Sequence, residues 1–192
     1  MTNMSAAAVR SVAPNKAAYS LATAQGISLR PVAPDDGELL YQIYASTRTD
    51  ELAAVPWTAA QKETFLRSQS HAQEAHYARH YRDATFEIIL ADGLPCGRLY
   101  VNRGVDEIRI VDITLLPAFR GRGWGTAILR DIHTQAIATH ASVTIHVEHT
   151  NPARRLYDRL GFEIVSDKGM YLQMRWTSAA SAATPSQLVQ LQ

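Results

Sequence analysis

The sequence predicts an α+β domain of about seven strands and about four helices. Short apolar stretches bounded by turn residues indicate the strands, and longer amphipathic stretches that begin with capping residues indicate the helices. The most restrictive stretch runs from Leu115 to Ile132, where an apolar segment passes through three closely spaced glycines into an amphipathic helix. We expect one domain over residues 27–176, because a chain of 192 residues has room for a single sizeable core.

One strand and two helices are expected first. Apolar residues alternate over residues 27–33, and the proline in this stretch favours a sheet edge, where it removes no ladder hydrogen bond. A helix is expected over residues 35–47. A second helix is expected over residues 58–81, because Thr58 and Gln61 stand in the positions of a capping box. The polar and aromatic second half of this helix is a candidate wall for a substrate site.

Three strands should follow. Residues 86–91 and 97–103 flank Asp92-Gly93, a dipeptide typical of tight hairpin turns, so they should pair antiparallel. Residues 107–115 are almost continuously apolar, which indicates a central strand. Asp112 interrupts this apolar run, and a carboxylate in such a position needs a partner or a function.

The last third of the domain should add a strand, a short helix and two more strands. Residues 142–149 have the pattern of a strand. Asn151-Pro152 then combines a capping residue with proline at the first helical position, which predicts a helix that ends at Gly161. Residues 162–165 and 170–176 should form the two final strands.

The glycine-rich turn before the third helix is suited to bind phosphate. A strand that enters a helix through such a turn leaves backbone N–H groups unpaired at the positive end of the helix. A turn needs one glycine with positive φ, so the additional glycines suggest that a ligand passes close to the backbone. The N–H groups of residues 122–126 are the expected donors, and two arginines would add charge. The residues concerned are Arg120, Gly121, Arg122, Gly123, Trp124, Gly125 and Thr126.

Two familiar phosphate-binding patterns do not fit this turn. A dinucleotide fingerprint requires glycine or alanine where Thr126 stands, and a P-loop requires a lysine that this stretch lacks. The arrangement Arg120-x-x-Gly123-x-Gly125 instead resembles the acetyl-CoA-binding motif of the GNAT acyltransferase superfamily. A second segment, from Asn151 to Phe162, resembles the other signature of that family in content, and the order of the elements is similar to that of the GNAT fold.

The resemblance implies a mixed central sheet that splays between the fourth and fifth strands. In the family, the pantetheine arm of acetyl-CoA pairs with the backbone in this splay. Here this implies backbone groups at Ile113 and Leu115, with the thioester oxygen on the Leu115 N–H, where it would be polarised. In the second motif, Asn151 and Arg154 are expected at the cofactor site. Trp124 stands where relatives usually carry an aliphatic residue, and it either packs under the helix or lies over the adenine.

Three side chains are candidates for proton transfer. Tyr157 matches the tyrosine of the second family motif and is the expected acid that returns a proton to the departing thiolate. His146 lies near the position where some relatives carry a glutamate, and an imidazole that titrates near neutrality suits a base. Asp112 is a second candidate base, although the resemblance also allows deprotonation through water. Acetyl-CoA would be a co-substrate, and no metal is expected.

Composition narrows the classes of partner. The net charge of +1, from 19 basic and 18 acidic residues, argues against a nucleic-acid-binding protein. Cys96 is the only cysteine and cannot form an internal disulfide, which fits a cytoplasmic location. No apolar run approaches the roughly 18 residues of a membrane span, so no membrane partner is expected. The oligomeric state stays open, a homodimer included.

The leading hypothesis is an N-acetyltransferase that moves an acetyl group from acetyl-CoA to a primary amine of a small molecule or protein, by direct attack in a ternary complex. A CoA-binding sensor or partner subunit without catalysis is the alternative. An acetyltransferase acting on aminoacyl-tRNA is a third hypothesis, which the near-zero net charge disfavours. Residues 1–26, rich in alanine and serine, and the uncharged residues 177–192 are expected to be disordered extensions.

Overall fold

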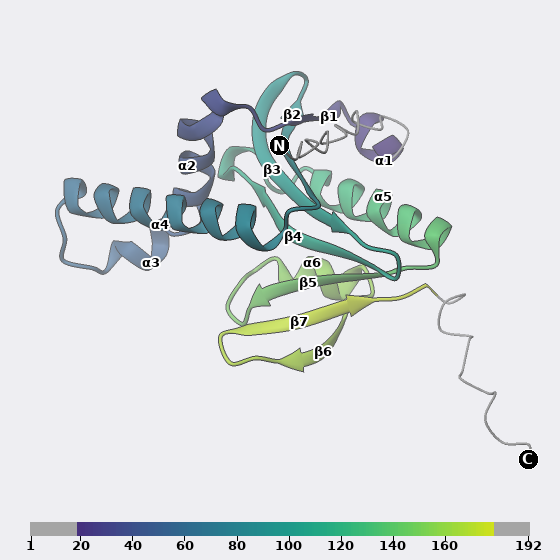
Figure 1. Ribbon diagram of the computed structural model, residues 1–192. Coiled ribbons are helices and arrows are strands. Elements are labelled where there is room, and N and C mark those ends of the chain that lie inside the picture. Colours follow the sequence, from purple (N-terminus) through teal and green to yellow (C-terminus); the bar gives the residue numbers. More distant parts are fainter. Residues whose placement is uncertain (1–18, 179–192) are drawn as a thin grey trace, which may run out of the picture.

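The computed structural model describes residues 19–178, which form a seven-stranded sheet with helices on both faces (Figure 1). The sheet has the strand order β1-β2-β3-β4-β5-β7-β6. The strands are β1 (Ile27–Pro31), β2 (Ala84–Ala91), β3 (Leu94–Arg103), β4 (Glu107–Leu115), β5 (Ser142–Glu148), β6 (Glu163–Asp167) and β7 (Tyr171–Trp176). The α-helices are α1 (Ser20–Thr23), α2 (Gly37–Ala45), α3 (Thr49–Ala53), α4 (Ala59–His80), α5 (Trp124–Thr139) and α6 (Arg154–Arg159). Short 3-10 helices cover Pro34–Asp36 (η2) and Pro117–Phe119 (η3).

The sheet is mixed, as the family resemblance implies. Strands β1 to β4 pair antiparallel, β4 pairs parallel with β5, and β5, β7 and β6 pair antiparallel. The β4–β5 pairing begins at Glu107 and Ser142 and ends at Ile110 and Ile145. Both strands continue beyond these residues, β4 to Leu115 and β5 to Glu148, so they diverge. We call this divergence the splay, and it confirms the fold class expected from the sequence.

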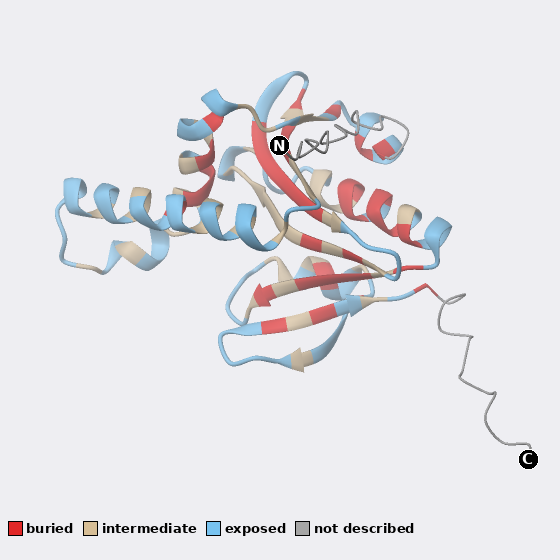
Figure 2. Ribbon diagram, in the orientation of Figure 1, coloured by how far each residue is buried: buried red, intermediate tan, exposed pale blue. Residues whose placement is uncertain are grey.

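Each face of the sheet packs against its own set of helices. The larger core lies between the sheet and helices α1, α5 and α6, and α5 contributes buried residues along most of its length (Figure 2). On the opposite face, Leu40 of α2 and Tyr77 of α4 pack against Ile88 and Tyr100 of the sheet. Most of α4 is exposed (Figure 2). Within residues 19–178, none of the helices is long and apolar enough to cross a membrane.

The first helix corrects the expected boundary of the N-terminal extension. The sequence predicts disorder up to residue 26, but 20–23 form α1, and Tyr19 and Ala22 are buried in the larger core. The carboxylate of Asp131 on α5 accepts the N–H groups of Leu21 and Ala22 at 3.0 and 2.9 Å. A side chain of α5 thus satisfies two N–H groups at the start of α1. Residues 1–18 and 179–192 lie outside the described residues.

The local turn and capping predictions are confirmed, with one shift. Asp92 and Gly93 have φ values of 48° and 83°, as a tight hairpin turn between β2 and β3 requires. Thr58 and Gln61 form the expected capping box at the start of α4. The last helix, α6, begins at Arg154 rather than at Asn151-Pro152, because those residues form a turn first. The short helix α3 is an addition, since the sequence predicts a helix that ends near residue 47 and none between it and residue 58.

Candidate active site

The glycine-rich turn lies between β4 and the first turn of α5. Gly123 is the N-cap residue of α5, with φ 83°, and no side chain caps the helix there. Gly121 also has positive φ, at 76°. A Cβ at Gly121 would meet no atom within 4 Å, and one at Gly123 would meet only the Gln25 side chain, at 3.8 Å. The turn therefore leaves open space beside uncapped helical N–H groups, which is suitable for an anion.

The two arginines of the turn bind its own carbonyl groups. Arg120 donates from Nε to the Leu115 carbonyl at 2.7 Å, and Arg122 donates from Nη2 to the Ala118 carbonyl at 3.2 Å. Both residues are exposed. The remaining N–H groups of each guanidinium keep a positive charge at the turn, so both residues could still bind a phosphate.

Trp124 has a packing role that the sequence left open, and Gly125 faces helix α6. Trp124 packs on the larger core and beside Phe119, with 6.0 Å between ring centroids, and Arg122 lies 5.2 Å above its ring. Trp124 thus packs under the start of α5. A Cβ at Gly125 would lie 3.5 Å from Leu156 of α6. This is an ordinary van der Waals distance, so packing against α6 does not by itself require glycine at this position.

The splay leaves part of β4 without a neighbouring strand on one side. Leu116 N–H donates to the Cys96 carbonyl on β3 at 2.9 Å, and Leu115 is opposite Gly97. Backbone groups alternate between the two sides of an antiparallel strand, so those of Ile113 and Leu115 face away from β3. The pairing with β5 ends at Ile110. These two backbone positions therefore face the splay. The family resemblance implies that a pantetheine arm would pair with the backbone there.

Tyr157 lies on α6, in the helical layer that packs on the larger core. Its side chain belongs to the larger core, is 4% exposed, and packs edge to face on Phe162 at 5.7 Å. Burial, together with the nearby negative charge of Asp112, raises the pKa of the Tyr157 hydroxyl. The phenol therefore stays protonated at neutral pH and can donate a proton or a hydrogen bond.

His146 lies on β5 immediately after the last pair with β4. Residues 143, 145 and 147 of this strand point into the larger core, so His146 points to the opposite face of the sheet. Burial, followed by the positive charges of Arg109 and Lys168, lowers the pKa of His146. At neutral pH the imidazole is neutral, the form in which it can accept a proton.

A cavity of about 400 Å³ opens beside His146 on the face that α4 covers. Helix α4 lines it with the polar and aromatic residues of its second half. Strand β4 contributes residues around its bulge, and the β6–β7 turn closes the other side. The lining residues are Gln73, His76, Tyr77, Tyr81, Arg109, Ile110, Val111, His146, Lys168 and Tyr171. His146 and Tyr157 thus lie on opposite faces of the sheet.

Asp112, the second candidate base, is engaged in a buried network. Its Oδ2 accepts from Arg98 Nη2 at 2.7 Å and from the Tyr77 hydroxyl at 3.2 Å, and its Oδ1 accepts from Thr114 Oγ1 at 2.8 Å. The Asp112 side chain is 10% exposed and that of Arg98 is 2% exposed. With these three donors, Asp112 has its partner and is better suited to hold β3, β4 and α4 together than to accept a proton from a substrate.

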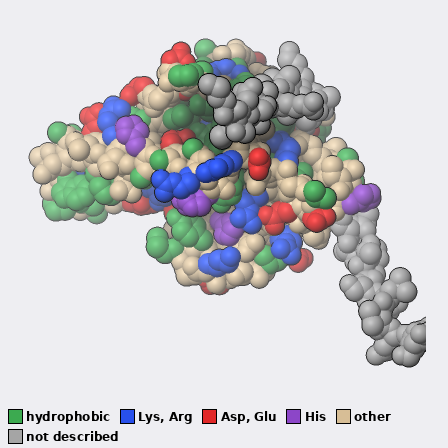
Figure 3. Space-filling model, in the orientation of Figure 1, with side chains coloured by type: hydrophobic (Ala, Val, Ile, Leu, Met, Phe, Trp, Pro, Cys, Tyr) green, Lys and Arg blue, Asp and Glu red, His purple; other side chains and the backbone are tan. Residues whose placement is uncertain are grey.

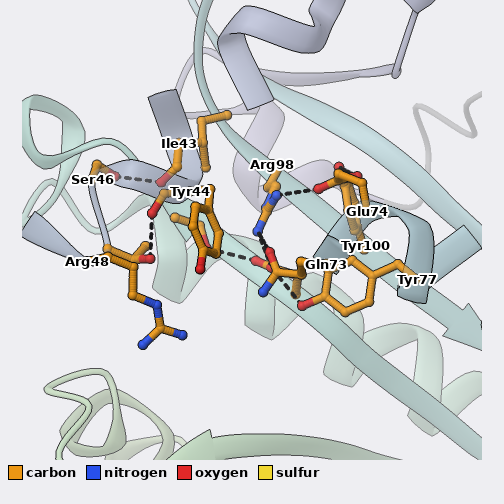
Figure 4. A network of polar contacts seen from close by, with 12 residues as sticks. Ile43, Tyr44, Ser46, Arg48, Gln73, Glu74, Tyr77, Arg98 and Tyr100 are labelled. Carbon is orange, nitrogen blue, oxygen red and sulfur yellow. Dashed lines mark hydrogen bonds and ion pairs between the residues drawn. The ribbon is translucent and has the colours of Figure 1, made fainter. Parts of the chain in front are cut away.

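The rest of this network was not found from the sequence. Figure 4 shows Arg98 between Glu74 and Gln73 of α4, which accept hydrogen bonds from its guanidinium at 2.6 and 2.7 Å. Tyr100 donates to Glu74 at 3.1 Å, and burial raises the pKa of that carboxyl. Arg98 is a charge within an apolar strand, the same signal that singled out Asp112, and it could have been found in the same way.

The remaining expected cofactor residues order the loop before α6. The side chain of Asn151 accepts the Ala153 N–H at 2.9 Å, which stabilises the turn ahead of the helix. Arg154 donates from Nη1 to the His149 carbonyl at 3.0 Å. Its buried Nε has no partner among residues 19–178. Neither contact assigns these side chains to a cofactor.

Comparison with known proteins agrees with this geometry. Residues 82–164 match the family model of the acetyltransferase (GNAT) domain. The fold is similar to that of PaiA N-acetyltransferase from Thermoplasma acidophilum in complex with coenzyme A (16% identity, TM-score 0.59, covering 79% of this chain and 99% of that chain). An acetyltransferase from Thermus thermophilus is similar as well (17% identity, TM-score 0.58, covering 79% of this chain and 97% of that chain). Arabidopsis thaliana Naa50 in complex with the bisubstrate analogue CoA-Ac-MVNAL also has a similar fold (14% identity, TM-score 0.51, covering 80% of this chain and 99% of that chain). No curated protein matches the sequence.

Proposed function

Since the chain carries a GNAT acetyltransferase domain, we propose that it is an acetyl-CoA-dependent N-acetyltransferase. It would move an acetyl group to a primary amine of a small molecule or protein by direct attack in a ternary complex. Two of the similar structures hold coenzyme A or a CoA-based bisubstrate analogue, and the latter carries a peptide. We place the reaction in the cytoplasm, where the one cysteine, a buried free thiol, stays reduced.

The observation that carries the proposal is the splay. The β4–β5 pairing stops at Ile110 and Ile145, and the backbone groups of Ile113 and the N–H of Leu115 then face the splay, while the Leu115 carbonyl accepts from Arg120. An extended ligand with amide groups of its own satisfies such backbone groups as an added strand would. The pantetheine arm of acetyl-CoA has this chemistry, and Leu115 N–H would then hold the thioester oxygen.

The glycine-rich turn supplies the other end of the same ligand site. Gly121 and Gly123 leave room for a pyrophosphate beside the uncapped N–H groups of α5, and Arg120 and Arg122 add positive charge. Because β4 leads into this turn, one ligand can contact both the splay and the helix start. The residues present therefore fit acetyl-CoA as a co-substrate.

His146 and Tyr157 supply the proton steps. A neutral His146 accepts the proton that the attacking amine loses as its nitrogen bonds to the carbonyl carbon. Leu115 N–H stabilises the negative charge that develops on the carbonyl oxygen. As the carbon–sulfur bond breaks, the Tyr157 hydroxyl donates its proton to the departing thiolate, and the products are an amide and free coenzyme A.

Two measurements test the proposal. Isothermal titration calorimetry with coenzyme A should give saturable binding, and a thiol-release assay with acetyl-CoA and a panel of primary amines should give amine-dependent coenzyme A. Absence of coenzyme A binding contradicts the proposal. Normal binding without transfer to any amine of a broad panel would instead favour a CoA-binding module without catalysis.

A further inference from the structure

The cavity beside His146 is lined by positively charged and neutral side chains. Arg109 and Lys168 are its two basic residues, Arg109 in an ion pair with Glu107 outside the lining, and none of the lining residues is an aspartate or glutamate. Within residues 19–178, the ion pairs of the protein do not include Lys168. Figure 3 shows lysine, arginine and histidine side chains gathered where α4 meets the β5–β7 part of the sheet. This face therefore offers cations to whatever enters the cavity.

Carboxylates next to the cavity residues have other partners, as for Glu148, which is opposite Tyr171 in the sheet and pairs with Arg48. Glu107 Oε1 lies 3.0 and 2.9 Å from Nε and Nη2 of Arg109, but Glu107 does not line the cavity. Asp112 is turned to Arg98 behind Tyr77. Asp167, next to Lys168 in the chain, lies 3.1 Å from His149. The positive charge of Lys168 is thus not neutralised by the acidic residues around it.

The positive charges of the cavity also affect the pKa of His146. Its pKa is lowered by burial and then by Arg109 and Lys168, and the opposing charge of Glu107 is the smallest contribution. A positive potential at this point attracts anions and disfavours cations.

Resting on the N-acetyltransferase function proposed above, we infer that the acceptor is a small primary amine that also carries an anionic group, a carboxylate or a phosphate, which Lys168 and Arg109 bind. The three cavity tyrosines, Tyr77, Tyr81 and Tyr171, can pack on the carbon chain between the two groups. The cavity volume of about 400 Å³ is that of a small-molecule site.

The same cations would help the amine to react. An amine must be neutral to attack a carbonyl, and nearby positive charges lower the pKa of a bound ammonium group. A second ammonium group on the acceptor would gain nothing from this and would be repelled by the same charges. The cavity therefore selects against diamines and polyamines.

Three amines of equal length test the inference: 5-aminopentanoate, pentylamine and 1,5-diaminopentane. We expect kcat/KM with acetyl-CoA to fall in this order, by about tenfold or more between the first and the last. A parallel pair, 2-aminoethyl phosphate and ethanolamine, tests whether a phosphate group raises kcat/KM in the same way as a carboxylate. Lys168→Glu should lower kcat/KM for the anionic amines by about tenfold and raise it for the diamine. Lys62→Glu, the same charge change on α4 outside the cavity lining, should leave the order unchanged.

A second readout does not depend on turnover. Saturation-transfer NMR with coenzyme A present should detect 5-aminopentanoate bound to the wild-type protein and a weaker signal with Lys168→Glu. Equal kcat/KM values for the three amines would overturn the inference, and so would 5-aminopentanoate binding that Lys168→Glu does not weaken. The proposed function would still stand in either case, provided that the protein binds coenzyme A and transfers the acetyl group. If the wild-type protein does not bind coenzyme A at all, that separate result contradicts the proposed function itself.

Discussion

Arg98 Nη2 of β3 lies 2.7 Å from Asp112 Oδ2 of β4, and both side chains are buried beneath α4. The same guanidinium contacts Glu74 at 2.6 Å, so one cation faces two carboxylates. This network ties the helix that lines the acceptor cavity to the strand that enters the splay. It therefore holds in register two parts of the site that are distant in the chain.

Replacing Arg98 by methionine should destabilise the fold strongly. The variant leaves the nearly buried Asp112 and the partly exposed Glu74 without their cation, and breaking a buried ion pair such as Arg98–Asp112 costs about 3–5 kcal/mol. Urea unfolding followed by circular dichroism measures this loss. The triple variant Arg98→Met, Asp112→Asn, Glu74→Gln is the control and should regain much of the stability, because no buried charge is left unpaired. An Arg98→Met variant as stable as the wild-type protein would show that the network has little energetic role.

Replacing Tyr157 by phenylalanine should lower kcat by about tenfold or more with little change in coenzyme A affinity, since the hydroxyl is needed only to return a proton to sulfur. The ring and its contact with Phe162 are kept, so the fold should persist. Steady-state kinetics and calorimetry separate the two effects. A variant with wild-type kcat would exclude Tyr157 as the acid.

Replacing Gly121 by alanine should weaken coenzyme A binding by about tenfold or more, because the added methyl group occupies the space expected for phosphate. Its positive φ of 76° adds strain of about 1–2 kcal/mol. Gly93 in the β2–β3 turn, with φ 83° and equally open surroundings, is the matched control. Thermal unfolding should show similar losses for Gly121→Ala and Gly93→Ala, and calorimetry should show weaker binding only for the first. Equal coenzyme A affinities would argue against a phosphate site at this turn.

His133 should make the stability of the fold depend on pH. It is buried on α5, stacks on Trp176 at 3.9 Å, and has a pKa lowered to about 4 by burial and, less strongly, by Arg130. Between pH about 6.5 and about 4, the unfolded chain binds a proton at this residue and the folded chain does not. Stability should therefore fall as the pH falls through this window, by at most about 1.4 kcal/mol per pH unit from this residue.

The matched variant for this prediction is His133→Gln, which cannot titrate. Urea unfolding at a series of pH values between about 4 and 7 should show a weaker pH dependence for the variant than for the wild-type protein. Identical pH profiles would mean that His133 is protonated to the same extent in the folded and unfolded states.

Local signals predicted the elements that local interactions stabilise. The Asp92-Gly93 turn and the Thr58–Gln61 capping box depend on residues within four positions of one another, and both form as expected. Helix α1 could not be found in this way. Its N–H groups are satisfied by Asp131, about 110 residues further along the chain, while its own alanine- and serine-rich composition resembles a disordered segment.

The acceptor cavity and the Arg98 network depend on how distant segments meet. Asp112 and Arg98 were each visible as charges in apolar strands, but their pairing follows from the β3–β4 register and its bulge near Tyr100. The contribution of α4 depends on where that helix crosses the sheet. The motif around Gly123 showed which residues form the turn, whereas the placement of Leu156 beside Gly125 depends on the position of α6.

The short parallel ladder between β4 and β5, from Glu107–Ser142 to Ile110–Ile145, joins two otherwise antiparallel halves of the sheet. A co-substrate lying in the splay would contact the free edges of both halves. It would add hydrogen bonds in the region where β4 and β5 no longer pair with each other. Ligand binding and the rigidity of the whole β-sheet should thus be coupled. When coenzyme A is added, deuterium exchange should slow most at the amide protons of Ile113 and Leu115.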